Sequence, residues 1–288
     1  MARVLKAIIW VGGQIYALLP RRISWLLGQG LGLFIYAILP VRKNVARANL
    51  ARAFPEMSSS ARRQILKRCY RHFGVALLDI LAIDGWARRP EAIAVLDTTT
   101  LETARDQGQG LVLVSGHLGN WEMIILALGR AGYPLVPVVK IQRGIGETIA
   151  SGLREATLTQ TISRHTSARK MLRLLRDGKF LGLAGDQEAL GKGTWVIFFG
   201  QPSSRFKGAA TFHLSSGEPL YFVRCLLGKD LRYHIDLIPV KVDDLSGDRE
   251  QDIQLLTQRH MDILETEVRE HPGQYFWFHR LWKSIPPQ

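Results

Sequence analysis

Cysteine is scarce in this sequence, which has only Cys69 and Cys225 among its 288 residues, both in apolar stretches. A disulfide framework or a cysteine metal site needs several cysteines at paired spacings, so the sequence excludes both. Stability must come from a hydrophobic core, and 47% hydrophobic residues over this length are enough to build one. We interpret both thiols as buried and inert, as free cysteines commonly are.

Several common catalytic motifs are also missing. Ser115 lacks the glycine two residues earlier that a serine-hydrolase elbow requires, because Leu113 stands there. The sequence contains no H-E-x-x-H zinc motif and no G-x-x-x-x-G-K-[ST] phosphate loop. Gly144-Ile-Gly146 is half of a dinucleotide fingerprint, but its sixth position is Ile149. We therefore expect no metal and no bound cofactor.

Acidic residues are rare at one end of the chain. Residues 1–89 contain 15 Lys and Arg against three acidic residues, a net charge of +12 out of +13 for the whole chain. An anionic membrane surface attracts such a segment, at roughly 1 kcal/mol for each basic residue near the lipid. Nucleic acid is the alternative partner for a basic patch. It would not explain the apolar runs nearby, so we predict anionic membrane lipid as a partner and no nucleic acid.

Those apolar runs are short. Ala7–Leu19 and Ile23–Leu39 contain 13 and 17 residues, whereas a membrane-spanning helix needs about 20. We favour a helical hairpin or interfacial anchor over residues 1–43, in the cytoplasmic leaflet, over a single spanning helix. A cleaved signal peptide is the least favoured alternative, because the basic cluster from Arg42 onward is typical of a stop-transfer flank.

Residues 44–288 are predicted to form the catalytic domain. Its first part, residues 44–90, contains a basic amphipathic helix that begins at Ser58–Ser60, whose hydroxyls can cap it, and runs to about Ile83. The second part, residues 96–288, alternates between strand-like and helix-like segments. This alternation predicts an α/β fold with a mixed, mainly parallel sheet flanked by helices. The expected strands are Leu111–Val114, Leu135–Val139, Phe180–Ala184, Trp195–Phe199, Leu220–Cys225 and Tyr233–Leu237, and the expected helices are Thr100–Asp106, Met123–Arg130, Ile145–Leu158, Ala168–Arg176 and Asp252–Arg269.

The strongest candidate for a catalytic site is Leu111–Glu122. A buried strand runs into a turn marked by Gly116 and Gly119, and a helix follows. In α/β folds, ligands bind at the ends of such strands. His117 lies on the turn, and Glu122 follows about one helical turn later.

The spacing of His117 and Glu122 is weak evidence by itself. A histidine with a glutamate five residues later occurs three times, at His117, His213 and His260. Within a helix this separation turns the two side chains about 140° apart. We therefore interpret His260 as solvated helix surface and His213 as a structural histidine. At His117 the glycines place the ring outside the helix, so Glu122 can point back at it.

This arrangement predicts general-base chemistry. A neutral imidazole can take a proton from an alcohol, and such help contributes about 10²–10⁴-fold to rate. A carboxylate on the far ring nitrogen would hold the tautomer. With no activated serine or cysteine nearby, the simplest reaction is direct attack of an acceptor hydroxyl on an acyl thioester. The backbone N–H groups of Gly119–Trp121 could then stabilise the oxyanion.

The stretch Ser115–Glu122, S-G-H-L-G-N-W-E, resembles the catalytic His-x4-Glu signature of the lipid A biosynthesis acyltransferase family, which includes lauroyl and myristoyl transferases. Other segments resemble the same family in order along the chain: Asn49–Pro55, Gly185–Gln187, Phe198–Gly200 and Trp277–Lys283. The resemblance covers nearly the whole chain. It implies a glycerolipid-acyltransferase-like fold and an enzyme on the cytoplasmic face of the inner membrane.

The resemblance also implies roles for single residues. His117 would be the general base and Glu122 its partner. Substrate-binding roles would fall to Gly119, Asn120, Arg164, Asp186 and Gln187. The donor would be an acyl carrier protein thioester, or the coenzyme A equivalent, and the acceptor a hydroxyl of a glycolipid, first a lipid A precursor.

One segment departs from the family pattern. Arg205 and Lys207 lie in Gln201–Gly208, where the family commonly has small residues. This departure leaves the acceptor head group open, with a phosphatidylinositol mannoside-like glycolipid or an aminolipid as alternatives. A non-catalytic protein that binds membranes or nucleic acid is the alternative from another class.

Overall fold

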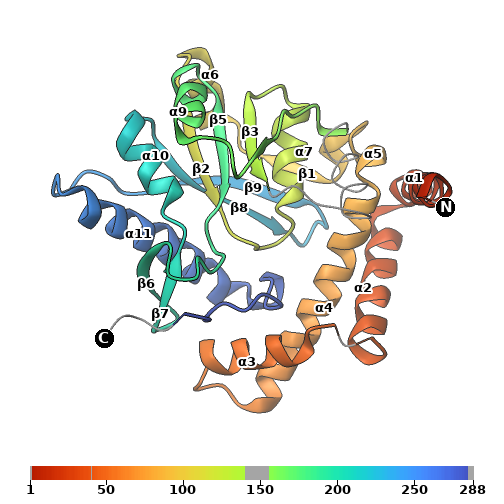
Figure 1. Cartoon of the computed structure of the whole chain (residues 1–288). Coiled ribbons are helices and arrows are strands. Elements are labelled where there is room, and N and C mark those ends of the chain that lie inside the picture. The colour runs from red at the N-terminus through yellow and green to blue at the C-terminus, as the bar shows by residue number, and fades with distance from the viewer. Residues whose placement is uncertain (1, 40, 140–155, 285–288) are drawn as a thin grey trace.

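The computed structural model describes residues 2–39, 41–139 and 156–284. A seven-stranded sheet forms its centre, with strand order β1-β9-β8-β2-β5-β3-β4 (Figure 1). The strands of this sheet are β1 (Ala94–Leu96), β2 (Leu111–Ser115), β3 (Leu135–Val139), β4 (Ile162–Ser163), β5 (Phe180–Ala184), β8 (Leu220–Leu227) and β9 (Tyr233–Pro239). A separate antiparallel hairpin consists of β6 (Thr194–Phe198) and β7 (Gln201–Arg205).

The prediction of a mixed, mainly parallel sheet is confirmed. Neighbouring strands are parallel except for β8 and β9, which pair antiparallel. The strand expected at Trp195–Phe199 forms, but as β6 of the hairpin rather than in the main sheet. Its partner β7 was not predicted, because Pro202, Ser203 and Ser204 give it no apolar pattern. The short strands β1 and β4 were also not predicted.

Two helical layers cover the sheet because β2 is apolar on both faces. Val112 and Val114 face a core shared with α9 (Ala168–Arg176), α10 (Gly208–Ser216) and α11 (Arg249–Glu270). Leu111 and Leu113 face a second core shared with α6 (Thr99–Asp106) and α7 (Glu122–Arg130). Such continuous burial is typical of a central parallel strand. Figure 1 shows α10 and α11 on one side of the sheet and α7 on the other.

The predicted helices are largely confirmed. Ser58 accepts a hydrogen bond from the N–H of Ala61 at 3.1 Å and so caps the basic helix, as expected. Most of the helix expected at 145–158 lies outside the described residues. The remaining bounds are α3 (Lys43–Ala53), α4 (Ser59–Leu81), α5 (Ile83–Trp86), α6 (Thr99–Asp106), α7 (Glu122–Arg130), α10 (Gly208–Ser216) and α11 (Arg249–Glu270).

The N-terminal apolar runs form two helices, α1 (Ala2–Leu18) and α2 (Arg21–Ala37), separated at Pro20. Helix α2 packs closely along α4. A Cβ atom on Gly32 would overlap the carbonyl oxygen of Tyr70, and one on Gly74 would overlap α2. In the ranges that the structure describes, none of the helices combines the length and the apolar character needed to cross a bilayer.

A buried ion pair joins the N-terminal helices to the sheet. Arg21 makes a two-point contact with Asp79 of α4, with N–O distances of 2.7 and 2.9 Å. The hydroxyl of Tyr233 in β9 donates to the same carboxylate at 2.8 Å. Since breaking a buried pair on one side costs about 3–5 kcal/mol, this contact holds α2, α4 and β9 together.

Candidate active site

The turn after β2 is shaped by Gly119. Its φ is +64°, and an added Cβ would overlap the carbonyl oxygen of Cys225 in β8. Only glycine combines this backbone angle with such a close approach. The N–H of Gly119 donates to the carbonyl of Gln274 at 2.8 Å. This amide is therefore occupied, so the predicted oxyanion contact falls to the N–H groups of Asn120 and Trp121 and stays a prediction, as does the substrate-binding role of Gly119.

Asn120 is also a structural residue of this turn. It is 1% exposed, and its carbonyl accepts a hydrogen bond from the Cys225 thiol at 3.1 Å. The predicted substrate contact of its side chain stays a prediction, because the side chain is buried at the turn and no described residue shows what it would bind. Burial raises the pKa of the Cys225 thiol above its ordinary value, which agrees with the prediction of an inert cysteine.

His117 is held by Asp186. The Asp186 Oδ1 lies 2.7 Å from His117 Nδ1, and its Oδ2 accepts the backbone N–H of His117 at 2.9 Å. The Tyr275 hydroxyl donates to Oδ2 at 3.2 Å. The sequence had placed Glu122 at the ring nitrogen, and this detail is wrong. Asp186 and Gln187 do lie beside His117, as the resemblance implied.

Glu122 lies next to the ring without a hydrogen bond to it. Its Oε1 accepts the indole N–H of Trp121 at 3.1 Å. Glu122 begins α7, so its backbone already follows the helix and its side chain turns toward Trp121. Burial raises the pKa of this carboxyl, while the Trp121 hydrogen bond and the charge of His117 act in the opposite direction. Its influence on His117 is electrostatic.

The hydrogen bonds define the tautomer of His117. An ionised carboxylate can only accept a hydrogen bond, so Nδ1 of the ring carries the proton and donates to Asp186. Nε2 then has a free lone pair, and the Gln187 amide nitrogen lies 3.3 Å from it. An alcohol that displaced this amide would present its proton to Nε2. This is the position required of a general base.

The charges around Asp186 support an ionised carboxylate. Burial alone would raise its pKa, but the charge of His117, two hydrogen bonds from His117 and the charge of Arg205 hold the pKa well below its usual range. Burial alone would lower the pKa of His117, but the charges of Asp186 and Glu122 and the Asp186 hydrogen bond raise it. The pair therefore stabilises the imidazolium that proton transfer would form.

Arg205 lies beneath this pair and not at the acceptor. It is fully buried in β7, and its guanidinium stacks 5.2 Å from the centre of the Phe198 ring. Burial lowers its pKa, and the negative charges of Asp186 and Glu188 act to raise it. The departure from the family pattern at Arg205 therefore concerns a buried position, and it gives no information about the acceptor head group. Lys207, its companion there, forms an exposed ion pair with Glu250 at 3.5 Å.

The interpretation of His260 as solvated helix surface is wrong. This histidine is 1% exposed, and burial lowers its pKa to about 4, although the charge of Asp186 acts to raise it. Its ring packs below Gly185, the residue before Asp186. The helical spacing indicated a surface position, because it does not show which face of α11 meets the sheet. His213 is structural as predicted, with Nδ1 2.8 Å from the Glu218 carbonyl.

The C-terminal segment completes the site. The N–H of Phe276 donates to the carbonyl of His117 at 2.9 Å, and the rings of Phe276 and His279 lie 6.2 and 4.9 Å from the His117 ring. The Asn49 amide donates to the carbonyls of Trp277 and His279 at 2.7 and 2.6 Å. Two segments that share the family resemblance, near the two ends of the chain, are thus tied together at His117.

A cavity of about 390 Å³ opens beside this site. Gln187, which touches His117 Nε2, is part of its lining. The complete lining is Arg42, Val45, Gln187, Glu188, His279, Arg280 and Lys283.

Arg164 lies apart from the cluster. It follows β4, and two strands separate β4 from β2, so at about 4.8 Å per strand it is roughly 14 Å away along the sheet edge. Its exposed guanidinium contacts His165 at 3.4 Å. The substrate-binding role that the resemblance implies for Arg164 stays a prediction, at the same sheet edge but outside the His117 cluster.

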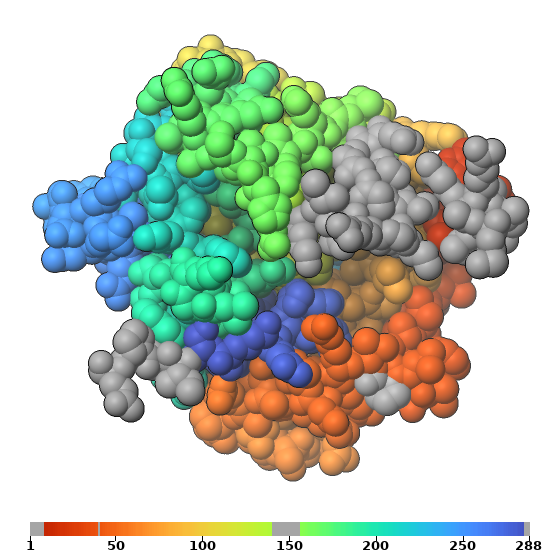
Figure 2. Space-filling view, in the orientation of Figure 1, coloured from red at the N-terminus to blue at the C-terminus, as the bar shows by residue number. Residues whose placement is uncertain are grey.

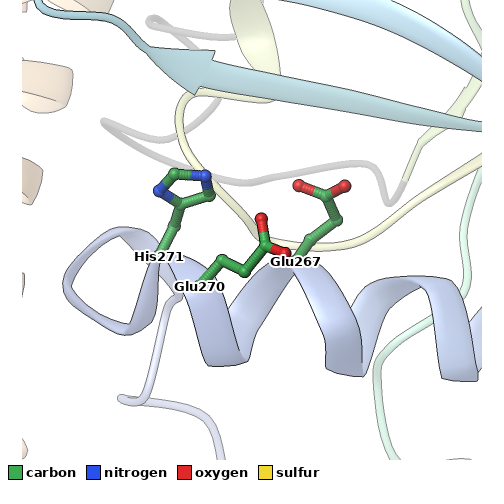
Figure 3. Close-up of side chains that lie close together, drawn as sticks. All are labelled: Glu267, Glu270 and His271. Carbon is green, nitrogen blue, oxygen red and sulfur yellow. The ribbon is translucent and has the colours of Figure 1, made fainter.

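Among the described residues, one group has the donor atoms for a metal ion. Glu267, Glu270 and His271 bring ligand atoms within 4.8 Å of one another at the end of α11 (Figure 3). Glu267 is already paired with Arg224 at 2.8 Å, and Glu270 is exposed. A cation already neutralises the buried carboxylate, so we assign no metal to this group.

Comparison with known proteins identifies relatives over the full length. The family described as bacterial lipid A biosynthesis acyltransferase matches residues 2–284. The lipid A biosynthesis palmitoleoyltransferase of Escherichia coli K12 is 23% identical over 283 residues, covering 97% of this chain and 90% of the relative. The E. coli K12 lipid A biosynthesis lauroyltransferase is 22% identical over 302 residues, with the same shares. A phosphatidylinositol mannoside acyltransferase of Mycolicibacterium smegmatis is 25% identical over 207 residues, covering 70% of this chain and 64% of the relative.

Proposed function

Since the chain belongs to the bacterial lipid A biosynthesis acyltransferase family, we propose that it transfers a fatty acyl chain from acyl carrier protein to a hydroxyl of a glycolipid. A lipid A precursor is the first choice of acceptor, as the names of the E. coli relatives suggest. The observation that carries the proposal is His117, with Nδ1 bonded to Asp186 at 2.7 Å and Nε2 3.3 Å from the amide nitrogen of Gln187, which lines the cavity.

In the proposed reaction, Nε2 of His117 takes the proton of the acceptor hydroxyl as its oxygen attacks the thioester carbonyl carbon. The tetrahedral intermediate then collapses, the C–S bond breaks, and the imidazolium returns the proton to the departing thiolate. Asp186 keeps the tautomer and stabilises the imidazolium, and Glu122 adds a second negative charge nearby. The scheme requires no cofactor, because the thioester already activates the acyl group.

The N-terminal helices support the proposed membrane association. Helices α1 and α2 expose large apolar side chains, among them Trp10, Ile15, Leu18, Leu26 and Phe34. Apolar side chains beside a strongly basic segment are typical of a protein that lies in an anionic membrane interface. We propose that these helices hold the enzyme on the cytoplasmic face of the inner membrane. The basic segment would also attract an acidic carrier protein.

The proposal is tested with purified protein, acyl carrier thioester and lipid A precursor, and product detection by mass spectrometry. His117→Ala should lose transfer by at least roughly 10³-fold, the range of a general base, while its circular dichroism and Tm stay close to those of the parent. His234→Ala is the matched control, because this histidine is half-exposed on β9 and paired with Asp230. Undiminished transfer by His117→Ala would refute the mechanism.

A second acceptor is supported by the similarity to the M. smegmatis enzyme, named as a phosphatidylinositol mannoside acyltransferase. The same assay with a mannosylated phosphatidylinositol distinguishes the two acceptors. Transfer to that lipid alone would replace the lipid A precursor as substrate and leave the role of His117 unchanged.

A further inference from the structure

The cavity beside His117 carries three cations from two distant parts of the chain. Arg42 precedes α3, and Arg280 and Lys283 belong to the C-terminal segment. One nitrogen of Arg42 donates to the Phe278 carbonyl at 3.1 Å, which fixes the two segments against each other. In Figure 2 the dark-blue C-terminal segment lies directly against the orange surface of the N-terminal region.

None of these three cations forms an ion pair within the described part of the chain, and the cavity lining has one carboxylate, Glu188, against them. Among the described residues, no carboxylate oxygen lies within 4.0 Å of a side-chain nitrogen of Arg42, Arg280 or Lys283. Glu188 also lines the cavity, but its carboxylate accepts the Ser284 hydroxyl at 2.8 Å and the backbone N–H of Lys283 at 3.4 Å. The cavity therefore has excess positive charge next to the catalytic base.

The ring of His279 lies in the cavity wall near these cations, and the charges of two of them affect its pKa. Burial lowers its pKa to about 4, the charges of His117, Arg42 and Lys283 act in the same direction, and the charge of Asp186 acts to raise it. His279 is therefore neutral at physiological pH and adds no further charge. The centres of the His279 and His117 rings are 4.9 Å apart, so one side chain, that of His279, links the cavity wall to the base.

The positive surface continues away from His117. A second cavity of about 440 Å³ shares Arg42 and Val45 with the first and adds Lys43, Asn44 and Arg47. It lies at the start of α3, which has no acidic residue in its first turn and no side-chain cap. The free N–H groups and the positive end of the helix dipole favour an anion there.

We propose that the cavity lined by Arg42, Arg280 and Lys283 binds a phosphate ester of a substrate and so places the reacting group at His117 Nε2. This rests on the proposed function. Arginine and lysine beside a cavity recognise phosphate by charge and by several N–H donors. The phosphate could belong to the glycolipid acceptor or to the phosphopantetheine arm of the donor, and the assays below separate these sources.

The test variant is Arg280→Gln with Lys283→Gln. Its matched control is Arg173→Gln with Arg176→Gln, which removes two exposed charges from the far end of α9. The KM for a phosphorylated acceptor should rise about 10–100-fold in the test variant, from the loss of charged hydrogen bonds, with kcat nearly unchanged. The KM for the dephosphorylated acceptor should stay at the parent value.

The donor is tested with an acyl carrier thioester and with an acyl N-acetylcysteamine thioester, which has no phosphate. If only the KM for the carrier thioester rises, the phosphate belongs to the donor, and the inference stands with that source. Unchanged KM values for both phosphorylated substrates, or equal losses for phosphorylated and dephosphorylated acceptors, would overturn it.

Binding without turnover keeps this inference separate from the proposed function. Calorimetry with glucosamine 1-phosphate should give the same Kd for the parent and for His117→Ala, and at least tenfold weaker binding to the Arg280 and Lys283 double variant. This outcome supports the phosphate site even if no glycolipid is acylated. Equal binding by the parent and the double variant would refute the site even if transfer is observed.

Discussion

Replacing Asp186 by asparagine tests the central contact of the site with almost no change in shape. The amide keeps the size of the carboxyl group but loses its charge, and the 2.7 Å contact with His117 Nδ1 is then neutral. Two opposite charges about 4 Å apart interact by on the order of 4 kcal/mol at an effective dielectric constant of about 20. At 1.36 kcal/mol for each factor of ten, we expect kcat to fall by roughly 10³-fold.

The assay is the pH dependence of acyl transfer. In the parent protein Asp186 raises the pKa of His117, so kcat/KM should rise with pH through a midpoint above the ordinary histidine value of about 6.5. Asp186→Asn removes the raising charge and leaves burial, which lowers the pKa. The midpoint should therefore move to lower pH, while the plateau rate falls.

Glu122→Gln is the matched comparison. Its amide can still accept the Trp121 N–H, and it removes a charge that is not hydrogen-bonded to the ring. We expect a loss of about tenfold in kcat, equivalent to about 1.4 kcal/mol. An Asp186→Asn protein that kept the parent rate and midpoint would refute the assignment of Asp186 as the partner of His117.

Two further predictions concern stability. Gly119→Ala should destabilise the fold by about 3 kcal/mol or more in urea unfolding, because the new side chain adds backbone strain and overlaps the Cys225 carbonyl. Gly108 also has a φ of +64° but lies in open space, so Gly108→Ala should show the backbone strain alone. Burial lowers the folded-state pKa of His72 and of His260 to about 4, so below the ordinary histidine pKa the unfolded chain binds more protons than the folded protein. The free energy of unfolding should therefore fall by up to roughly 3 kcal/mol per histidine as the pH drops from about 6.5 to 4. A flat urea midpoint over this range would contradict the buried neutral state of both rings.

Much of the fold followed from local pattern. The six expected strands all form, because an apolar run bounded by glycine identifies a buried strand without reference to its neighbours. The strands that were not predicted are two or three residues long, or contain proline and serines, as β7 does. Such strands form because a neighbouring strand supplies hydrogen-bond partners, and the local sequence does not show which strand will be the neighbour.

The sequence by itself determined that His117 is on a turn at the end of a strand, because two glycines and the flanking apolar runs lie within a dozen residues. Only the tertiary structure decided which carboxylate holds it. Strands β2 and β5 pair in parallel with Ser115 opposite Ala184, so the residues two positions further, His117 and Asp186, meet at the same edge. Glu122 is near in sequence, but α7 directs it to Trp121. Strand pairing, set by the whole core, therefore outweighs local spacing at this site.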